Sequence, residues 1–170
     1  MRLNLTRIAQ EPGAVLPCDL ELDLSQVEWN GQRPFDGGVH ITGRVRNMAG
    51  AMVLSARLSS VLSLTCDRCA KPFEREKSVE YETLLALELE NGENDDIVLP
   101  DADGKLDLDG LMEEVFLLEM DTKNLCSEDC RGLCSGCGAD LNVEPCRCKK
   151  EIDPRLAKLA QLLEDREPDK

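Results

Sequence analysis

The chain has 170 residues, of which 42% are hydrophobic and only 3% aromatic, and its formal net charge is −14. This length suits one domain, or one domain with a small appendage, around a core of aliphatic side chains. The acidic balance excludes binding to nucleic acid over the whole surface, because such binding depends on neutralising phosphates with Lys and Arg.

The acidic residues are concentrated in the middle of the chain. Residues 1–75 carry nine Lys or Arg and eight Asp or Glu, residues 76–125 carry three and sixteen, and residues 126–170 carry eight and ten. Only the two ends therefore remain available to phosphates. The acidic middle is either a solvated surface or one that attracts a basic partner such as a ribosomal protein.

The sequence indicates a cytoplasmic protein. Residues 1–13 lack the apolar run of a secretory signal, and no stretch approaches the roughly 18 apolar residues of a membrane span. In the cytoplasm the nine cysteines, an odd number, are expected to stay reduced. Metal binding is then the leading explanation for cysteines that recur in close pairs.

Alternating apolar and polar residues predict a series of strands in the first half of the chain. They lie near residues 2–9, 16–24, 39–45, 54–64 and 79–89. Five strands in succession predict an antiparallel sheet, curled or partly closed into a barrel. Cys18 falls on an apolar strand face without a close cysteine neighbour, which is typical of a buried structural thiol.

Two helices are predicted after the strands. Helical spacing of apolar residues runs from Leu108 to Met120, with Asp107 or Asp109 as N-cap, and Asp153-Pro154 opens a last helix. The fold class is therefore α+β: a sheet or partial barrel, a helix, a cysteine-rich module and a C-terminal helix. We place the β-rich domain with its acidic helix at residues 1–122 and the cysteine-rich module with the C-terminal helix at 123–170.

Eight cysteines form four close pairs: Cys66/Cys69, Cys126/Cys130, Cys134/Cys137 and Cys146/Cys148. Thiolates at this spacing converge on one tetrahedral ion, so the pairs predict two structural zinc sites of four thiolates each. Loop closure favours joining the third pair to the fourth, which leaves the first pair with the second. An iron–sulfur cluster in place of zinc stays open, because thiolates hold both metals.

The sequence predicts no catalytic residues and no small-molecule substrate. Four thiolates fill the coordination sphere of zinc, and the single histidine, His40, falls on a polar strand face. A thioredoxin-type role for Cys66 and Cys69 needs a βαβ setting, whereas these residues join antiparallel strands. No phosphate-binding glycine motif is present. A thiol redox or metal-dependent enzyme is the less favoured alternative.

The segment CDRCAKPF, followed by LCSEDCRGLCSGCGADLN and then CRC, resembles the YceD family, the large ribosomal RNA subunit accumulation proteins. The resemblance covers residues from about 55 to 150, and at position 70, where the family often has glycine, this chain has alanine. It implies a bacterial, non-enzymatic factor in the accumulation or processing of large-subunit (23S) rRNA. The implied partners are ribosomal RNA, a pre-large-subunit particle or a basic ribosomal protein.

Basic residues form two candidate patches for phosphate or partner contact. The first lies on the predicted sheet and consists of Arg44, Arg46 and Arg57. The second surrounds the cysteines and consists of Arg68, Lys71, Arg75, Arg131, Arg147, Lys149 and Lys150. Two alternatives remain open: ordinary surface basicity, and an acidic adaptor that binds a basic partner without touching RNA.

Overall fold

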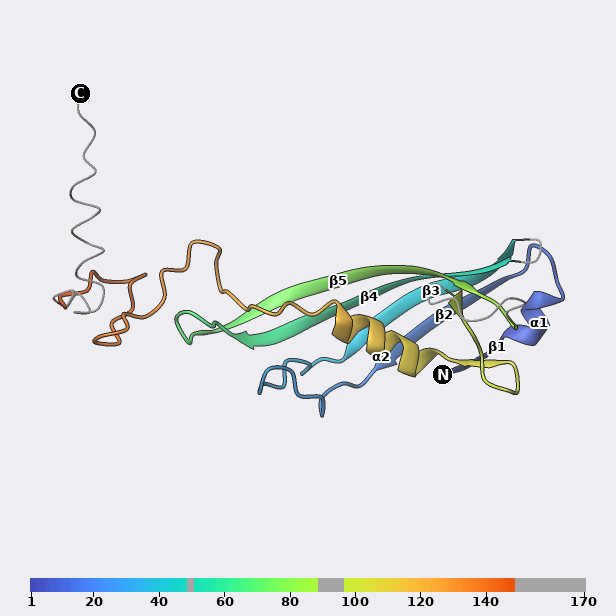
Figure 1. Cartoon of the computed structure of the whole chain (residues 1–170), viewed down its shortest axis with the longest axis horizontal. Helices are drawn as coiled ribbons and strands as arrows, with labels where there is room; N and C mark the ends of the chain where they lie inside the picture. Colours follow the sequence, from blue (N-terminus) through green and yellow to red (C-terminus); the bar gives the residue numbers. More distant parts are fainter. Residues whose placement is uncertain (49–50, 89–96, 149–170) are drawn as a thin grey trace, which may run out of the picture.

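The computed structural model describes residues 1–48, 51–88 and 97–148. Its elements in order are β1 (Arg2–Asn4), α1 (Leu5–Ala9), β2 (Val15–Leu22), β3 (Val39–Met48), β4 (Ala51–Thr65), β5 (Pro72–Leu85), β6 (Ile97–Val98), β7 (Lys105–Asp107) and α2 (Leu108–Leu118). Figure 1 shows a long curved sheet with α2 along one face. The cysteine-rich segment continues beyond the end of the sheet where β4 turns into β5 (Figure 1).

The main sheet has the order β2-β3-β4-β5-β6 and is open, since this order runs from one edge to the other within the described residues. The strands from β2 to β5 are antiparallel neighbours. β6 instead pairs with β5 in parallel, Leu84 opposite Ile97. The α+β class is therefore confirmed, but the sheet is mixed rather than wholly antiparallel.

The prediction of one strand over residues 2–9 was wrong. Only Arg2–Asn4 is a strand, and it pairs with β7 in a separate two-stranded sheet. α1 follows at once, because the Asn4 side chain accepts a hydrogen bond from the Arg7 N–H and caps the helix. Leu5 and Ile8 are both buried. Their spacing of three residues is helical rather than alternating.

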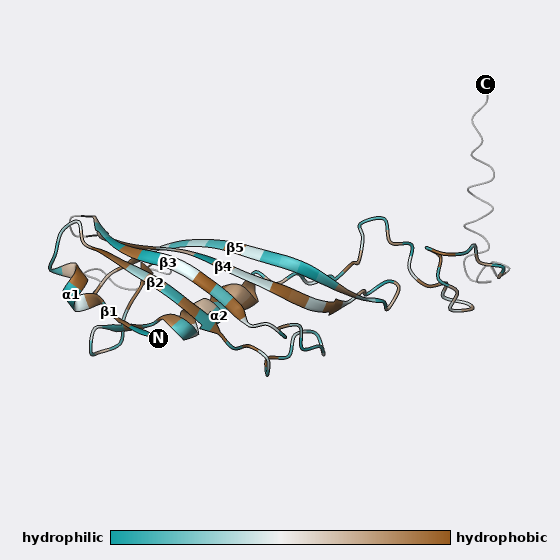
Figure 2. Ribbon diagram, turned by 180° about the vertical axis from the view of Figure 1, so that it is seen from behind, coloured by the Kyte–Doolittle hydropathy of each residue, from teal (hydrophilic) through white to brown (hydrophobic). Residues whose placement is uncertain are grey.

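β4 and β5 form the longest hairpin, paired from Met52 opposite Leu85 to Thr65 opposite Pro72. Apolar side chains of β4 alternate into the core, and Figure 2 shows the corresponding bands of hydropathy along the strands. β5 begins at Pro72, earlier than predicted from sequence. Charged residues between Phe73 and Ser78 conceal its alternation, although pairing with β4 continues to the tip. This long hairpin carries Cys66 and Cys69 beyond the main body.

The core lies between the inner face of the sheet and α2. Phe116 of α2 is fully buried and meets Phe35 edge to face, with ring centroids 6.1 Å apart. Cys18 is 3% exposed and His40 is exposed on the outer face, both as predicted.

None of the helices in the described ranges has the length and apolar character needed to cross a membrane. The predicted helix from Asp153 lies outside the described residues.

Candidate metal centres

The turn between β4 and β5 aims two thiols to one side. Its backbone closes on itself, since the Cys66 N–H donates to the Lys71 carbonyl and the Ala70 N–H donates to the Cys66 carbonyl, each at 2.9 Å. Ala70 adopts a φ of 56°, in the left-handed region that favours glycine. The turn therefore requires the left-handed conformation at position 70. Glycine, which the similar family motif often has at this position, adopts that conformation readily.

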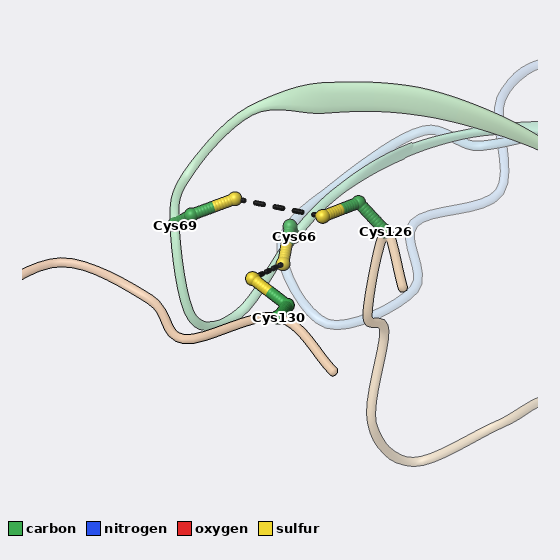
Figure 3. Close-up of side chains that lie close together, drawn as sticks. All are labelled: Cys66, Cys69, Cys126 and Cys130. Carbon is green, nitrogen blue, oxygen red and sulfur yellow. Dashed lines mark hydrogen bonds between the residues drawn. The ribbon is translucent and has the colours of Figure 1, made fainter. Parts of the chain in front are cut away.

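The first tetrad consists of Cys66, Cys69, Cys126 and Cys130, whose sulfur atoms all lie within 4.8 Å of one another. Figure 3 shows the four side chains converging, with Cys66 3.8 Å from Cys130 and Cys69 3.6 Å from Cys126. Four sulfurs at about 2.3 Å from one tetrahedral ion stand about 3.8 Å apart. Three of the four cysteines are buried, and only Cys126 is exposed. The arrangement therefore fits a single metal ion.

Polar contacts fix the second half of this tetrad against the hairpin tip. The Arg68 guanidinium donates to the carbonyl oxygens of Cys130 at 2.7 Å and Glu128 at 3.3 Å. Asp67 and Asn124 exchange two hydrogen bonds, one from each backbone N–H. Segments nearly 60 residues apart in sequence are thus aligned by groups other than the thiols.

The second tetrad consists of Cys134, Cys137, Cys146 and Cys148, again with all sulfur atoms within 4.8 Å. Cys134 and Cys137 sit in a second tight turn, closed by the Gly138 N–H donating to the Cys134 carbonyl at 2.8 Å. Cys137 and Cys148 are exposed, and the other two are half-buried. The structure therefore groups the four pairs as loop closure favoured, and makes the second site the more open one.

The two tetrads are joined through the residues around Arg68. The Leu133 N–H donates to the Arg68 carbonyl at 2.9 Å. Gly132 has a φ of 75°, and a Cβ there would lie 2.9 Å from that same carbonyl, so only glycine fits. From the segment that carries the second tetrad, the Asn142 amide donates to the Cys130 sulfur at 3.5 Å, and Asp140 pairs with Lys71. The cysteine-rich segment thus docks on the hairpin tip as one connected unit.

The thiol pKa values show that each tetrad holds negative charge unevenly. Burial raises the pKa of Cys66, but hydrogen bonds from the backbone of Cys126, Cys69 and Arg68 outweigh it and lower the pKa to about 6. The hydrogen bond with Cys69 and then burial raise the pKa of Cys126 to about 12. A first thiolate disfavours a further one beside it, and a divalent cation removes that penalty.

The second tetrad shows the same division. Hydrogen bonds from Cys146 and from the backbone of Cys137 and Gly136 lower the pKa of Cys134 to about 6. Hydrogen bonds with Cys137 and Cys146 raise the pKa of Cys148 to about 12. Four-sulfur tetrahedral sites suit zinc or iron. The short sulfur separations fit one ion better than a cluster, which spreads its ligands around several metal atoms.

Three of the predicted contact residues are engaged within the chain. Arg68 holds Cys130, and Lys71 holds Asp140. Arg75 donates to the Asp121 carboxylate and to the Leu125 carbonyl, and lies 5.2 Å from the centre of the Phe73 ring. The structure therefore places these cations where the tip of the β4–β5 hairpin contacts the segment from Asp121 to Asp140. We call this contact region the joint.

The remaining predicted contact residues are distributed over two regions. Arg44, Arg46 and Arg57 do share the outer face of the sheet, but Arg57 pairs with Glu80, and Glu82 lies beside them. That face is mixed in charge rather than basic. Arg131 and Arg147 are exposed on the cysteine module. Lys149 and Lys150 lie outside the described residues.

Two residues that build the joint, Asn124 and Asp140, received no role from sequence. Asn124 is 3% exposed, which is unusual for a polar side chain. Single polar residues between cysteines have no periodicity or motif that separates them from ordinary loop residues. Only their contacts with Asp67 and Lys71 reveal them.

The fold and the two tetrads define a small α+β protein. Cysteines at the tip of its longest hairpin lie beside cysteines from a later segment. The chain belongs to the family of the large ribosomal RNA subunit accumulation protein YceD, whose model matches residues 54–163. That range contains both tetrads.

Individual relatives are more distant. An uncharacterized protein of Mycobacterium tuberculosis is 25% identical over 174 aligned positions, covering 96% of this chain and 81% of the relative. A Mycobacterium leprae protein is also 25% identical, covering 94% and 76%. The maize chloroplastic large ribosomal RNA subunit accumulation protein YCED homolog 1 is 25% identical, covering 87% and 61%. No solved structure matches the chain.

Proposed function

We propose that this protein is a non-enzymatic ribosome-biogenesis factor, needed for the accumulation or processing of 23S rRNA. Membership of the YceD family carries the proposal, supported by the name of the maize relative. Its partners would be ribosomal RNA or a pre-large-subunit particle. We place its action in the cytoplasm, where the free thiols of the nine cysteines would stay reduced.

The proposed cofactor is zinc, one ion in each tetrad. When bound, it supplies a structural cross-link between segments that are far apart in sequence. Zinc at Cys66, Cys69, Cys126 and Cys130 would join the β-rich unit, residues 1–122, to the cysteine module, residues 123–170. Four thiolates leave no open coordination position, which supports a structural role over catalysis.

We assign the RNA-facing role chiefly to Arg131 and Arg147, with Lys149 and Lys150 following in sequence. Within the described part of the chain, neither arginine forms an ion pair. Arg44 and Arg46 are exposed candidates on the sheet. For Arg68, Lys71 and Arg75, holding the joint is the better supported role.

Deletion of the gene tests the proposal. The ratio of mature 23S to 16S rRNA should fall, and the sucrose-gradient peak of the large subunit should shrink. The wild-type gene should restore both, and a Cys69→Ser gene should restore them less well than a Cys18→Ala gene. A normal rRNA ratio together with a normal subunit profile would contradict the proposal.

The second candidate is a protein adaptor that binds a basic partner without contacting RNA. It is favoured by the acidic residues of α2, a helix that lies along the sheet, whereas the cysteine-rich segment continues beyond the end of the sheet (Figure 1). Purification of the protein from nuclease-treated cells distinguishes the two. Recovery of a defined protein after RNA removal favours the adaptor, whereas loss of all partners with the RNA favours direct RNA contact.

A further inference from the structure

Part of the surface of α2 is apolar although it faces away from the core. Leu118 is 77% exposed, and Leu117 beside it is half-buried. Together with Trp29 and Met120 they line an open groove of about 460 Å³ that also borders Gly110. This is within the range of about 300–1,000 Å³ found for binding clefts. Apolar side chains gathered in a groove are typical of a surface that a partner covers.

Carboxylates accompany this groove. Glu113 and Glu114 line it directly, and residues 107–121 contain six Asp or Glu with no Lys or Arg. Two of the six are already paired: Asp109 with the N-terminal amino group, and Asp121 with Arg75 and Lys77. Within the described ranges, neither Glu113 nor Glu114 has an ion-pair partner. Both remain available to a cation from outside.

We propose that this groove binds a basic amphipathic segment of another protein. Apolar side chains of the segment would sit against Leu118 and Trp29, and its Lys or Arg side chains would lie beside Glu113 and Glu114. Burial of the apolar contact supplies affinity, as in other helix-in-groove complexes. The carboxylates select a cationic partner and speed its encounter.

The same charges disfavour two other occupants. A nucleic acid would bring its phosphates against Glu113 and Glu114. A second copy of this chain, bound through a two-fold contact, would bring these carboxylates near their own equivalents. The inference rests on the proposed function only in the source of the partner, since a ribosomal particle would supply basic protein segments.

A synthetic peptide tests the groove without knowledge of the natural partner. The probe is a fluorescein-labelled helix of about 18 residues, roughly five turns, built from Leu and Lys with the leucines in one stripe. A scrambled peptide of equal composition keeps the charge and loses the stripe. Fluorescence anisotropy with the full chain, purified in zinc, should show tighter binding of the striped peptide.

Three variants locate the binding. Leu118→Ser should weaken the striped peptide about tenfold, as loss of an interface anchor does. Glu113→Gln with Glu114→Gln should weaken it and flatten its dependence on salt. Val61→Ser is the matched control, because Val61 is 49% exposed on the outer face of β4 and remote from the groove. It should leave the affinity unchanged.

Equal affinity for the two peptides, or unchanged affinity in Leu118→Ser, would overturn the proposal. So would a wild-type dimer that Leu118→Ser dissociates, because the groove would then hold a second copy. Purified components make this result independent of rRNA levels. A normal rRNA ratio in the deletion strain would remove the ribosomal role and leave the groove intact, so the two failures are distinguishable.

Discussion

The Arg68 guanidinium donates to the Cys130 carbonyl at 2.7 Å and thereby ties the hairpin tip to the chain that supplies the other half of the first tetrad. Arg68 stands between Cys66 and Cys69, so one turn contributes both the two thiols and the cation that positions their partners. This bond orients the backbone rather than the sulfur. It should therefore help to preorganise the site before a metal ion binds.

Removing this contact tests preorganisation. Arg68→Ala should lower the free energy of unfolding by about 1–2 kcal/mol, because two carbonyl acceptors lose a charged donor. Zinc affinity at the first tetrad should fall with it. The matched control is Arg44→Ala, an exposed arginine on the outer face of β3. Urea unfolding of both variants measures the effect, and equal stability of the two would contradict a role for Arg68 in the joint.

Single cysteine changes should separate the metal ligands from the remaining thiol. Cys69→Ser removes one of four ligands and should lower zinc content from two ions per chain to one. It should also lower the melting temperature, since metal binding contributes folding energy. Cys18→Ala should keep both ions, because Cys18 is buried in the core, and should cost about 1 kcal/mol of packing.

Elemental analysis measures the zinc content of the two variants, and thermal unfolding measures their melting temperatures. Two ions retained in Cys69→Ser would show that Cys69 is not needed to hold zinc in the first tetrad. Visible absorbance in the wild type would instead indicate an iron–sulfur cluster, since zinc is colourless.

The strands β3 and β4 could be predicted because one face is buried, which imposes a period of two on their side chains. The pairing of the cysteines could be predicted because short loops close at lower entropic cost. Neither argument reaches α1, where a single side-chain cap at Asn4 decides between strand and helix. Nor does either reach β6, whose two residues join the sheet only through tertiary pairing.

The roles of the cations were the least predictable part. Sequence identifies Arg68, Lys71 and Arg75 as positive charges near the cysteines, and phosphate contact follows naturally from that. Their actual partners are a carbonyl of Cys130 and the carboxylates of Asp140 and Asp121, all at least 46 positions away. Periodicity and local spacing carry no information about such distant partners.

The two tetrads should release zinc at different rates. Three ligands of the first are buried, whereas Cys137 and Cys148 of the second are exposed. A chelator reaches the second site more readily, so release to a coloured metal indicator should be biphasic. Cys137→Ser should abolish the fast phase and Cys69→Ser the slow one. A single phase in the wild type, or the opposite assignment of phases, would contradict this order.

Zinc binding should release protons and weaken as the pH falls. At pH 7 the metal-free first tetrad holds Cys66 as thiolate, with its pKa near 6. Cys126, with a pKa of about 12, and Cys69, with its pKa raised above 9, remain protonated. Coordination requires thiolates, so these two groups alone release two protons per ion.

Calorimetry in buffers of different ionisation enthalpy counts those protons. At least two per zinc ion should be released at pH 7, and the affinity for zinc should fall more steeply below about pH 6, where Cys66 and Cys134 protonate in the metal-free protein. A depressed thiol pKa makes the deprotonated form the native one, so its contribution is lost on acidification. A zinc affinity that does not change between pH 8 and pH 5 would contradict this coupling.

Charge reversal tests the proposal that arginines of the cysteine module contact RNA. The double variant Arg131→Glu with Arg147→Glu should weaken binding to a 23S rRNA transcript and reduce the dependence of affinity on salt by about one unit per lost phosphate contact. The control, Arg7→Glu with Arg33→Glu, makes the same change in net charge at exposed positions of α1 and of the turn where Arg33 pairs with Glu28. Because both variants differ equally from the wild type in charge, a general repulsion from RNA affects them alike. If the RNA-binding surface lies on the cysteine module, Arg131→Glu with Arg147→Glu should bind RNA more weakly than the control. Equal weakening of the two variants would attribute the effect to net charge alone.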